Sequence, residues 1–196
     1  NEEINPHGLQ NIIDFFPDAT FIINSKKQIV AWNKALEEMT GIKAAEMLGK
    51  GRYAYAIPFY GDARPIIIDL IDSKDRETTR RYQNFKKEGS RVCGEIYAPL
   101  VYQGRGAYLW AMAAPYYNHR GKRLGAIQTI RDITPHRKTE QDLKESEERY
   151  RQILATIQEG YYEMDLAGNI IFCNDACCQL LGRSKNELIG VHFREI

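Results

Sequence analysis

A thirteen-residue pattern occurs twice in this chain, and the repetition limits the folds that the chain can adopt. IVAWNKALEEMTG occupies residues 29–41 and IIFCNDACCQLLG occupies residues 170–182, each position matching one 141 residues further on. The identical pairs are Ile29 and Ile170, Asn33 and Asn174, Ala35 and Ala176, and Gly41 and Gly182. A length of 196 residues suits one complete domain followed by part of a second. The repetition therefore predicts two related domains in series.

The first copy of the pattern predicts a β-hairpin followed by short helices. Residues 20–33 hold two apolar runs around a polar turn, which is typical of a hairpin. Residues 34–41 and 43–49 have helical spacing, and each ends at a glycine suited to a left-handed cap. Asn33 and Asn174 recur where a strand passes into a helix, so each is expected to cap the helix that follows it. A helix is also expected before Pro17, over residues 1–16.

Later segments predict more helix and then three strands. Residues 66–73 are typical of a short buried helix, and residues 77–89 of a polar helix that presents Tyr82 and Phe85. Three segments with strand periodicity follow, separated by glycine-containing turns: 95–102, 107–117 and 124–132. Together with the hairpin, they predict an α+β domain on a five-stranded antiparallel sheet with short helices on one face.

A charged helical linker is expected to join the two copies. Thr134 can cap a helix whose first position is Pro135, and residues 135–157 contain no glycine or proline after that point. In a heptad frame the seam positions are Ile133, His136, Glu140, Leu143, Glu147, Tyr150, Leu154 and Ile157. Two glutamates on the seam indicate only weak coiled-coil pairing.

Composition argues against several partners. Net charge is +1, with 27 basic and 26 acidic residues and no long block of one sign, so neither nucleic acid nor an anionic membrane is an expected partner. No apolar run is long enough to cross a bilayer, although a membrane anchor can lie outside this stretch of chain. Four cysteines, three of them close together, do not form a disulfide framework and favour a reducing, cytoplasmic setting.

Three segments resemble the PAS family of sensor domains. They are DATFIINSKKQIVAWNKALEEMTGIKAAEMLGKG at residues 18–51, GAIQTIRDIT at residues 125–134, and EGYYEMDLAGNIIFCNDACCQLLGRSKNELIGVHF at residues 159–193. The resemblance implies a PAS domain over residues 17–134, a signalling helix over 135–157 and the front part of a second PAS domain over 158–196. Asp132, Ile133 and Thr134 resemble the family's signal-relay junction between the last strand and the signalling helix.

The resemblance implies a non-catalytic sensor module that binds a small ligand and passes its state to another domain of the same chain. Such tandem copies are most often the input region of a histidine kinase, while transcription regulators and cyclic-dinucleotide enzymes also use them. A ligand-free dimerisation scaffold is the alternative, and a homodimer is expected in either case. No phosphate-binding glycine loop, zinc-protease helix or nucleophile elbow supports an enzyme.

Neither of the family's common cofactors is expected, and the identity of any other stays open. A flavin-binding light-oxygen-voltage domain needs a reactive cysteine in a motif that the middle helices lack, and Ile130 stands where the flavin-contacting glutamine would be. Haem needs an axial ligand, usually histidine. The histidines lie outside residues 42–88, at His7, His119, His136 and His192.

The cysteine cluster allows two interpretations. Cys173, Cys177 and Cys178 can in principle hold a metal, but there is no CxxC pair or fourth ligand. The simpler interpretation is that Cys173 replaces Trp32 and Cys177 replaces Leu36 as small buried residues. We expect no metal site.

By analogy with the family fold, one face of the last three strands should point towards the helices. The residues on that face are Tyr97, Pro99, Leu109, Ala111, Ala113, Gln128 and Ile130, with Tyr108, Trp110 and Met112 on the opposite face. Small alanines leave room, and Arg64 can pair with a carboxylate ligand, although a surface role is more usual for arginine. The candidate ligand-binding residues are Tyr55, Arg64, Tyr97, Ala111, Ala113, Gln128 and Ile130.

Overall fold

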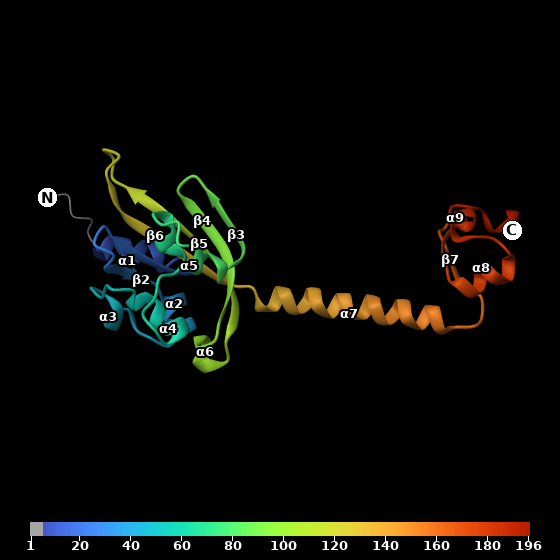
Figure 1. The fold of residues 1–196 in the computed structure, drawn as a ribbon, viewed down its shortest axis with the longest axis horizontal. Coiled ribbons are helices and arrows are strands. Elements are labelled where there is room, and N and C mark those ends of the chain that lie inside the picture. The colour runs from blue at the N-terminus through green and yellow to red at the C-terminus, as the bar shows by residue number, and fades with distance from the viewer. Residues whose placement is uncertain (1–5) are drawn as a thin grey trace. The chain divides into compact units, whose positions relative to one another are not determined.

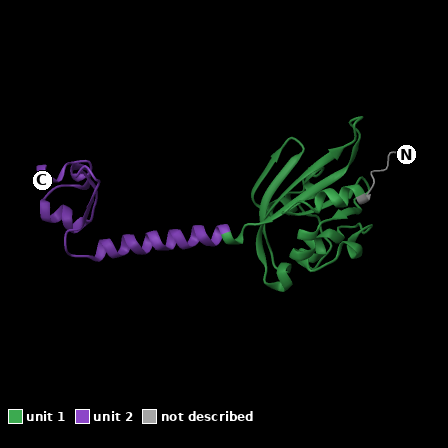
Figure 2. Ribbon diagram, turned by 180° about the vertical axis from the view of Figure 1, so that it is seen from behind, with its two compact units in different colours: residues 1–135 green, residues 136–196 purple. Residues whose placement is uncertain are grey.

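The structure, a computed structural model, describes residues 6–196. The first five residues of the expected helix 1–16, and the side chain of His7, lie outside this described part. The chain divides into unit 1, Asn1–Pro135, and unit 2, His136–Ile196 (Figure 2). Unit 1 contains the first copy of the thirteen-residue pattern, and unit 2 contains the second.

Unit 1 is built on an antiparallel sheet whose strand order is β2-β1-β6-β5-β4-β3 (Figure 1). The strands are β1 (Ala19–Asn24), β2 (Ile29–Trp32), β3 (Gln83–Glu88), β4 (Arg91–Ala98), β5 (Ala107–Tyr117) and β6 (Arg123–Asp132). The predicted hairpin is β1–β2, and the predicted three-stranded meander is β4–β5–β6. Strand β4 begins four residues earlier than expected and ends at Ala98 rather than at Tyr102. The α+β class is therefore confirmed, but the sheet has six strands rather than the expected five.

The additional strand corrects the prediction of a helix over residues 77–89. Helix α5 (Arg76–Arg80) occupies only the start of that segment, and β3 then pairs antiparallel with β4. Nearly all of β3 is exposed, as befits a lysine-containing edge strand, so it lacks the apolar alternation that normally reveals a strand. Between the two elements, the Tyr82 hydroxyl turns inwards and accepts a hydrogen bond from the Ile67 N–H at 3.0 Å.

Short helices cover one face of the sheet in unit 1. They are α2 (Lys34–Thr40), α3 (Ala44–Met47), α4 (Ile57–Tyr60) and α6 (Val101–Gly104), with 3₁₀ turns η1 (Ala54–Ala56) and η2 (Ile67–Ile71). The predicted caps are present, because Asn33 accepts from the Leu36 N–H and Gly41 is left-handed with φ 74°. The expected buried helix over 66–73 is the 3₁₀ turn η2, whose five residues are all buried.

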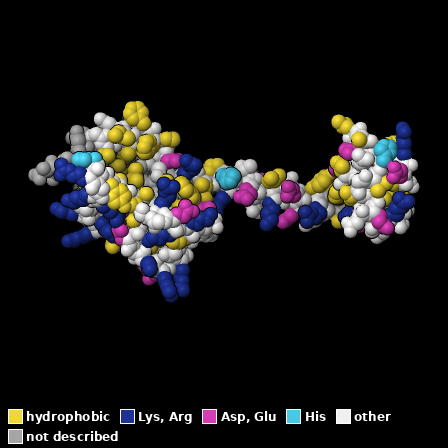
Figure 3. Space-filling view, turned by 90° about the horizontal axis from the view of Figure 1, so that it is seen from above, with side chains coloured by type: hydrophobic (Ala, Val, Ile, Leu, Met, Phe, Trp, Pro, Cys, Tyr) yellow, Lys and Arg dark blue, Asp and Glu magenta, His cyan; other side chains and the backbone are white. Residues whose placement is uncertain are grey.

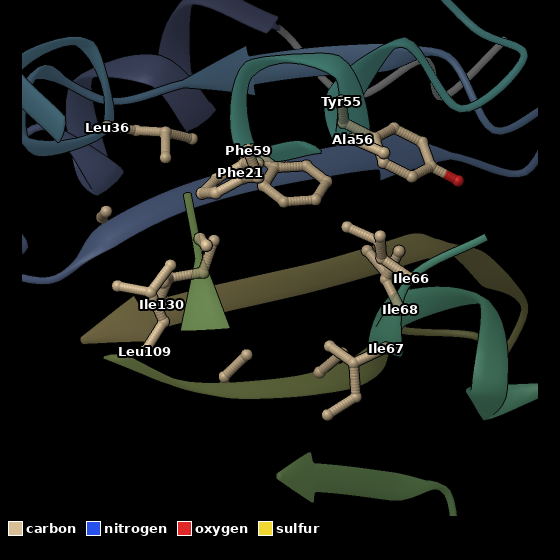
Figure 4. Packing of buried hydrophobic residues seen from close by; sticks show 14 of the residues in the cluster. Phe21, Leu36, Tyr55, Ala56, Phe59, Ile66, Ile67, Ile68, Leu109 and Ile130 are labelled. Carbon is tan, nitrogen blue, oxygen red and sulfur yellow. The ribbon is translucent and has the colours of Figure 1, made fainter. Parts of the chain in front are cut away.

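The main core lies between these helices and the inner face of the sheet (Figure 4). Phe21 is fully buried and its ring stacks on that of Tyr55, with centroids 5.3 Å apart. On the opposite face, α1 (Pro6–Ile13) places Ile13 against Ile22 and Ala31 in a separate small core. The sheet is thus covered on both faces over β1 and β2.

Unit 2 repeats the front of unit 1 on a smaller scale. Its elements are β7 (Tyr162–Met164), β8 (Ile170–Cys173), α8 (Asp175–Leu181), α9 (Lys185–Leu188) and the 3₁₀ turn η3 (Phe193–Glu195). A cluster of Ile170, Cys173, Cys177 and Leu188 forms its core. Gly182 and Gly190 are left-handed, as Gly41 and Gly49 are in unit 1. The repeated sequence therefore folds into the same supersecondary motif twice.

The expected linker is one helix, α7 (Thr134–Thr156). Acidic and basic side chains are interspersed along it, as Figure 3 shows. Among residues 6–196, no helix combines the length and apolar character that a membrane span requires.

Candidate functional site

A small cavity lies where α4 and η2 face the inner side of the sheet. Helix α4 contributes Phe59 and Tyr60, and Figure 4 shows Phe59 facing Ile130 and Leu109 of the sheet. The full lining consists of Phe59, Tyr60, Ile66, Tyr82, Ile96, Leu109, Ala111, Gln128 and Ile130. The cavity volume is about 10 Å³, roughly what one water molecule needs. The wall is mostly apolar, with three polar side chains.

Gln128 carries the most unusual feature of the cavity. Its side chain is 2% exposed, yet among the described residues its Oε1 atom has no hydrogen-bond partner. Gln128 lies on β6 opposite Phe21 of β1 and Ala113 of β5, and neither side chain can donate a hydrogen bond. A buried acceptor left unpaired costs about 1–3 kcal/mol of folding free energy. The amide is therefore available to a donor group that enters the cavity.

Two tyrosines supply the other polar groups. Burial, opposed in part by Arg64 and by a hydrogen bond to Tyr82, raises the pKa of Tyr60 to about 12. Burial, with nearby Tyr60 next in size, raises the pKa of Tyr82 well above its ordinary value. Both phenols therefore stay protonated near neutral pH and can act as neutral donors or acceptors.

The structure brings three of the seven predicted ligand-binding residues together around the cavity, namely Ala111, Gln128 and Ile130. Ala113 is buried on the same face of β5 but does not line the cavity. Arg64 does not line the cavity but contacts the cavity residue Tyr60. Its guanidinium carbon is 4.0 Å from the centroid of the Tyr60 ring, and its Nη1 atom is 3.6 Å from Asp62 Oδ1.

Tyr97 corrects the predicted orientation of β4. Its side chain is 49% exposed, and its register partner across the sheet is Tyr108, with ring centroids 5.1 Å apart. Cross-strand partners share a face, so Tyr97 points outwards with Tyr108, and Ile96 faces the cavity instead. Pro99, also expected to face the helices, is exposed beyond the end of β4. The outward placement predicted for Tyr108 is confirmed.

Tyr55 belongs to a different polar cluster. Its hydroxyl donates to the carboxylate of buried Asp69, 3.0 Å from each oxygen, and Lys27 reaches Asp69 Oδ1 at 2.7 Å. Figure 4 shows this hydroxyl pointing away from Leu109 and Ile130. Burial, followed by the Asp69 charge, raises the pKa of Tyr55. The cluster ties η1 and η2 to the β1–β2 turn.

The repeated Asn33 joins three backbone segments of unit 1. It is fully buried; its Oδ1 accepts from the N–H groups of Thr20 at 2.8 Å and Leu36 at 3.0 Å. Its Nδ2 donates to the carbonyls of Ile13 at 3.0 Å and Asp18 at 2.9 Å, and more distantly to Phe16 at 3.3 Å. The side chain thus holds the end of α1 against the start of β1 and caps α2.

Asn174 makes the matching set of contacts in unit 2. Its Oδ1 accepts from Tyr161 N and Cys177 N, and its Nδ2 donates to the carbonyls of Leu154 and Glu159. Each of these four partners lies 141 residues after its counterpart around Asn33. The end of α7 therefore occupies in unit 2 the place that α1 occupies in unit 1. The sequence pattern predicts the caps but not the contacts to the preceding helix.

The residues predicted to relay the signal form a hydrogen-bonded junction between β5 and α7. Ile133 N donates to the Tyr108 carbonyl at 2.9 Å, and Thr134 Oγ1 accepts from Tyr108 N at 2.9 Å. Asp132 Oδ1 accepts from Thr134 N at 2.8 Å. Thr134, the first residue of α7, is thus hydrogen-bonded to strand β5, whose Leu109 and Ala111 line the cavity.

Cys173, Cys177 and Cys178 do not gather metal ligands, since residues 6–196 contain no group of three or more such side chains positioned for a metal. Cys173 and Cys177 are buried in the core of unit 2, as expected for replacements of Trp32 and Leu36. Cys178 is half-buried, and its Sγ lies 3.6 Å from that of Cys173.

Known proteins resemble both units. The family described as PAS fold matches residues 8–133, and the family described as PAS domain matches residues 148–196. No curated protein matches the chain. Similar solved structures include the PAS domain of Bordetella pertussis BvgS, at 18% identity and TM-score 0.45, covering 72% of this chain and 96% of that one. A PAS domain from Colwellia psychrerythraea shares 19% identity with TM-score 0.42, covering 66% and 97%. This chain belongs to the PAS domain family, with a second PAS match following the first.

Proposed function

We propose that unit 1 is a sensory module that binds a small ligand in the cavity beside Gln128. The observation that supports this proposal is that the Oε1 atom of Gln128 is buried and unpaired. The side chain lies in a wall of apolar residues and two neutral phenols. A ligand that donates an N–H or O–H group to Oε1 removes the penalty of an unpaired acceptor. The favoured ligand is thus small, mostly apolar and uncharged at its buried end.

Ligand entry requires the cavity to widen, and α4 is the element best suited to move. It is a single turn that carries Phe59 and Tyr60 and ends at Gly61, a left-handed residue with φ 84°. An irregular segment follows from Gly61 to Pro65. Few backbone hydrogen bonds hold this segment, so an outward shift breaks little regular structure.

The bound ligand then biases α7 by population shift. Strand β5 connects the cavity with the start of α7. Its Leu109 and Ala111 line the cavity, and the backbone of Tyr108 forms hydrogen bonds with Ile133 and Thr134. A ligand that favours one position of β5 favours one arrangement of the helix. At the other end of α7, Asn174 binds the Leu154 carbonyl, so the same helix enters unit 2.

The proposed setting is the input region of a cytoplasmic signalling protein, most simply a sensor histidine kinase, with catalysis in another domain of the same chain. Homodimerisation is proposed through α7, where Leu143, Tyr150 and Ile153 are 60%, 50% and 51% exposed. Leu154, a predicted seam residue, is instead 5% exposed within unit 2, which shortens the available seam.

A ligand-free dimerisation scaffold is the second candidate. The observation that favours it is the cavity volume of about 10 Å³, since most of the interior is filled by the protein's own side chains. Native mass spectrometry of the purified chain distinguishes the two functions. A retained small-molecule adduct supports the sensor, and an adduct-free dimer supports the scaffold.

The direct test is a thermal-shift screen of small metabolites on the wild-type chain, Gln128→Leu and Thr129→Val. Thr129 is the neighbouring residue on the opposite face of β6, so its variant is a matched control. We expect one or more compounds to stabilise the wild type and Thr129→Val but not Gln128→Leu. A compound that stabilises all three proteins equally would show that the Gln128 amide is not the recognition group.

A further inference from the structure

Two thiols of unit 2 lie in contact. The Sγ atoms of Cys173 and Cys178 are 3.6 Å apart, one at the end of β8 and the other in α8. A disulfide bond has an S–S distance of about 2.05 Å, so the pair must approach by roughly 1.6 Å. Side-chain rotation in α8 can supply a movement of that size. Both thiols are free.

The residues of unit 1 that match Cys173 and Cys178 show how exposed these two positions are beside a six-stranded sheet. Cys173 corresponds to Trp32, which is fully buried, and Cys178 corresponds to Glu37, whose side chain is 19% exposed. Glu37 keeps this exposure although unit 1 has its entire sheet. Cys178 therefore occupies a position that stays partly accessible even beside a six-stranded sheet, while Cys173 occupies a buried one.

The surroundings favour reaction at Cys178 followed by closure with Cys173. Lys185 lies beside α8, ion-paired with Asp175 at 3.1 Å. Burial, with the hydrogen bond to Cys178 next, raises the pKa of Cys173 to about 11, and the positive charge of Lys185 opposes this rise only in small part. The buried thiol is consequently the second reactant, which attacks only after Cys178 has been activated.

We propose that Cys173 and Cys178 form a reversible dithiol–disulfide site for low-molecular-weight disulfides such as glutathione disulfide. The Cys178 thiolate attacks the small disulfide, forming a mixed disulfide and releasing one small thiol. The Cys173 thiolate then attacks Cys178 Sγ, forming the internal bond and releasing the second small thiol. Both thiol protons pass to the released small thiolates, and the small disulfide takes up the two electrons.

The internal bond closes a ring around Asn174. That residue lies between the two cysteines in sequence, and its side chain holds the Leu154 carbonyl at the end of α7. The bond thus links the end of β8 to α8 around Asn174, the residue that contacts α7. Oxidation is expected to slow hydrogen exchange at the amides that Asn174 binds, those of Tyr161 and Cys177.

The test is oxidation of the whole chain with glutathione disulfide, followed by alkylation of remaining thiols and peptide mass analysis. Cleavage before Asp175 separates Cys173 from Cys177 and Cys178, so an internal bond holds the two fragments together until reduction. We expect the bond in the wild type and in Cys93→Ser, the control for the solitary thiol on β4. We expect its loss in Cys178→Ser, which alters a half-buried position.

Fragmentation of the linked wild-type peptide identifies the partner of Cys173 without reliance on a variant in the core. Four outcomes overturn the proposal: a bond between Cys177 and Cys178, a bond from Cys173 to Cys177, a stable glutathione adduct on Cys178 without closure, or no reaction in folded protein. Retention of the bond in Cys178→Ser would do the same.

Discussion

Replacing Asn33 with alanine tests whether one side chain holds α1, β1 and α2 together. The substitution removes two accepted hydrogen bonds and an Nδ2 amide group whose two hydrogens are shared among three carbonyl oxygens, all at a fully buried site. Alanine leaves a cavity too small and too constrained to rebuild them all with water. Unit 1 should therefore lose stability, with α1 affected most strongly.

The magnitude follows from the groups left unpaired. Loss of the cap on Leu36 N costs about 1 kcal/mol. The buried Thr20 N–H loses its Asn33 acceptor, which costs about 1–3 kcal/mol. The carbonyls of Ile13 and Asp18 keep the Phe16 N–H and the Thr20 hydroxyl, so each loses one net hydrogen bond of about 0.5–1.5 kcal/mol. Allowing for local relaxation, we expect a loss of about 3–5 kcal/mol in the free energy of unfolding.

Urea denaturation followed by tryptophan fluorescence measures this loss in unit 1 alone, because both tryptophans of the chain, Trp32 and Trp110, lie there. Asn24→Ala is the control, since Asn24 accepts hydrogen bonds in an exposed turn. Its loss should stay below about 1 kcal/mol. An Asn33→Ala loss no larger than that of Asn24→Ala would refute the reasoning.

Three further predictions concern the interior of unit 1. Gln128→Leu should raise the free energy of unfolding by about 1 kcal/mol in urea titrations, because the unpaired acceptor disappears; a destabilised variant would mean that a water or ligand already pairs with it. Tyrosine absorbance should show Tyr60 and Tyr82 titrating above the ordinary tyrosine pKa, so stability falls as pH rises between the unfolded value of 10.0 and the folded value of about 12 for Tyr60. Simple titration of all tyrosines near 10 in folded protein would contradict this. Gly125→Ala should prevent native pairing of β6, because its Cβ would lie 1.9 Å from the Ile23 carbonyl oxygen; an unchanged melting temperature would disprove the close approach.

The repeated pattern was informative because its residues act locally. Asn33 and Gly41 occupy the ends of one short helix, so spacing alone predicted both caps. The same spacing could not reveal the contacts of Asn33 with Ile13 and Asp18, because these depend on how α1 packs on the sheet. Local signals thus predicted the elements better than the connections between them.

The residues of the candidate site were also predicted where local signals sufficed and missed where tertiary contacts decide. Alternation sorted the residues of β5 and β6 into two faces, and analogy with the family fold placed Ala111, Gln128 and Ile130 on the inner one, where the structure has them around the cavity. Tyr97 was assigned to the wrong face because the register between β4 and β5 is not visible in the pattern of either strand. Tyr82 was missed as a cavity residue because the exposed edge strand after it resembles a polar helix.

The relay itself is tested most directly by hydrogen exchange on the whole chain with and without a compound that the metabolite screen identifies. We expect altered exchange at the amides of Tyr108, Ile133 and Thr134 and at the start of α7, in addition to residues around Gln128. Protection confined to the cavity, with the β5–α7 junction unchanged, would contradict the proposed link between ligand binding and the helix.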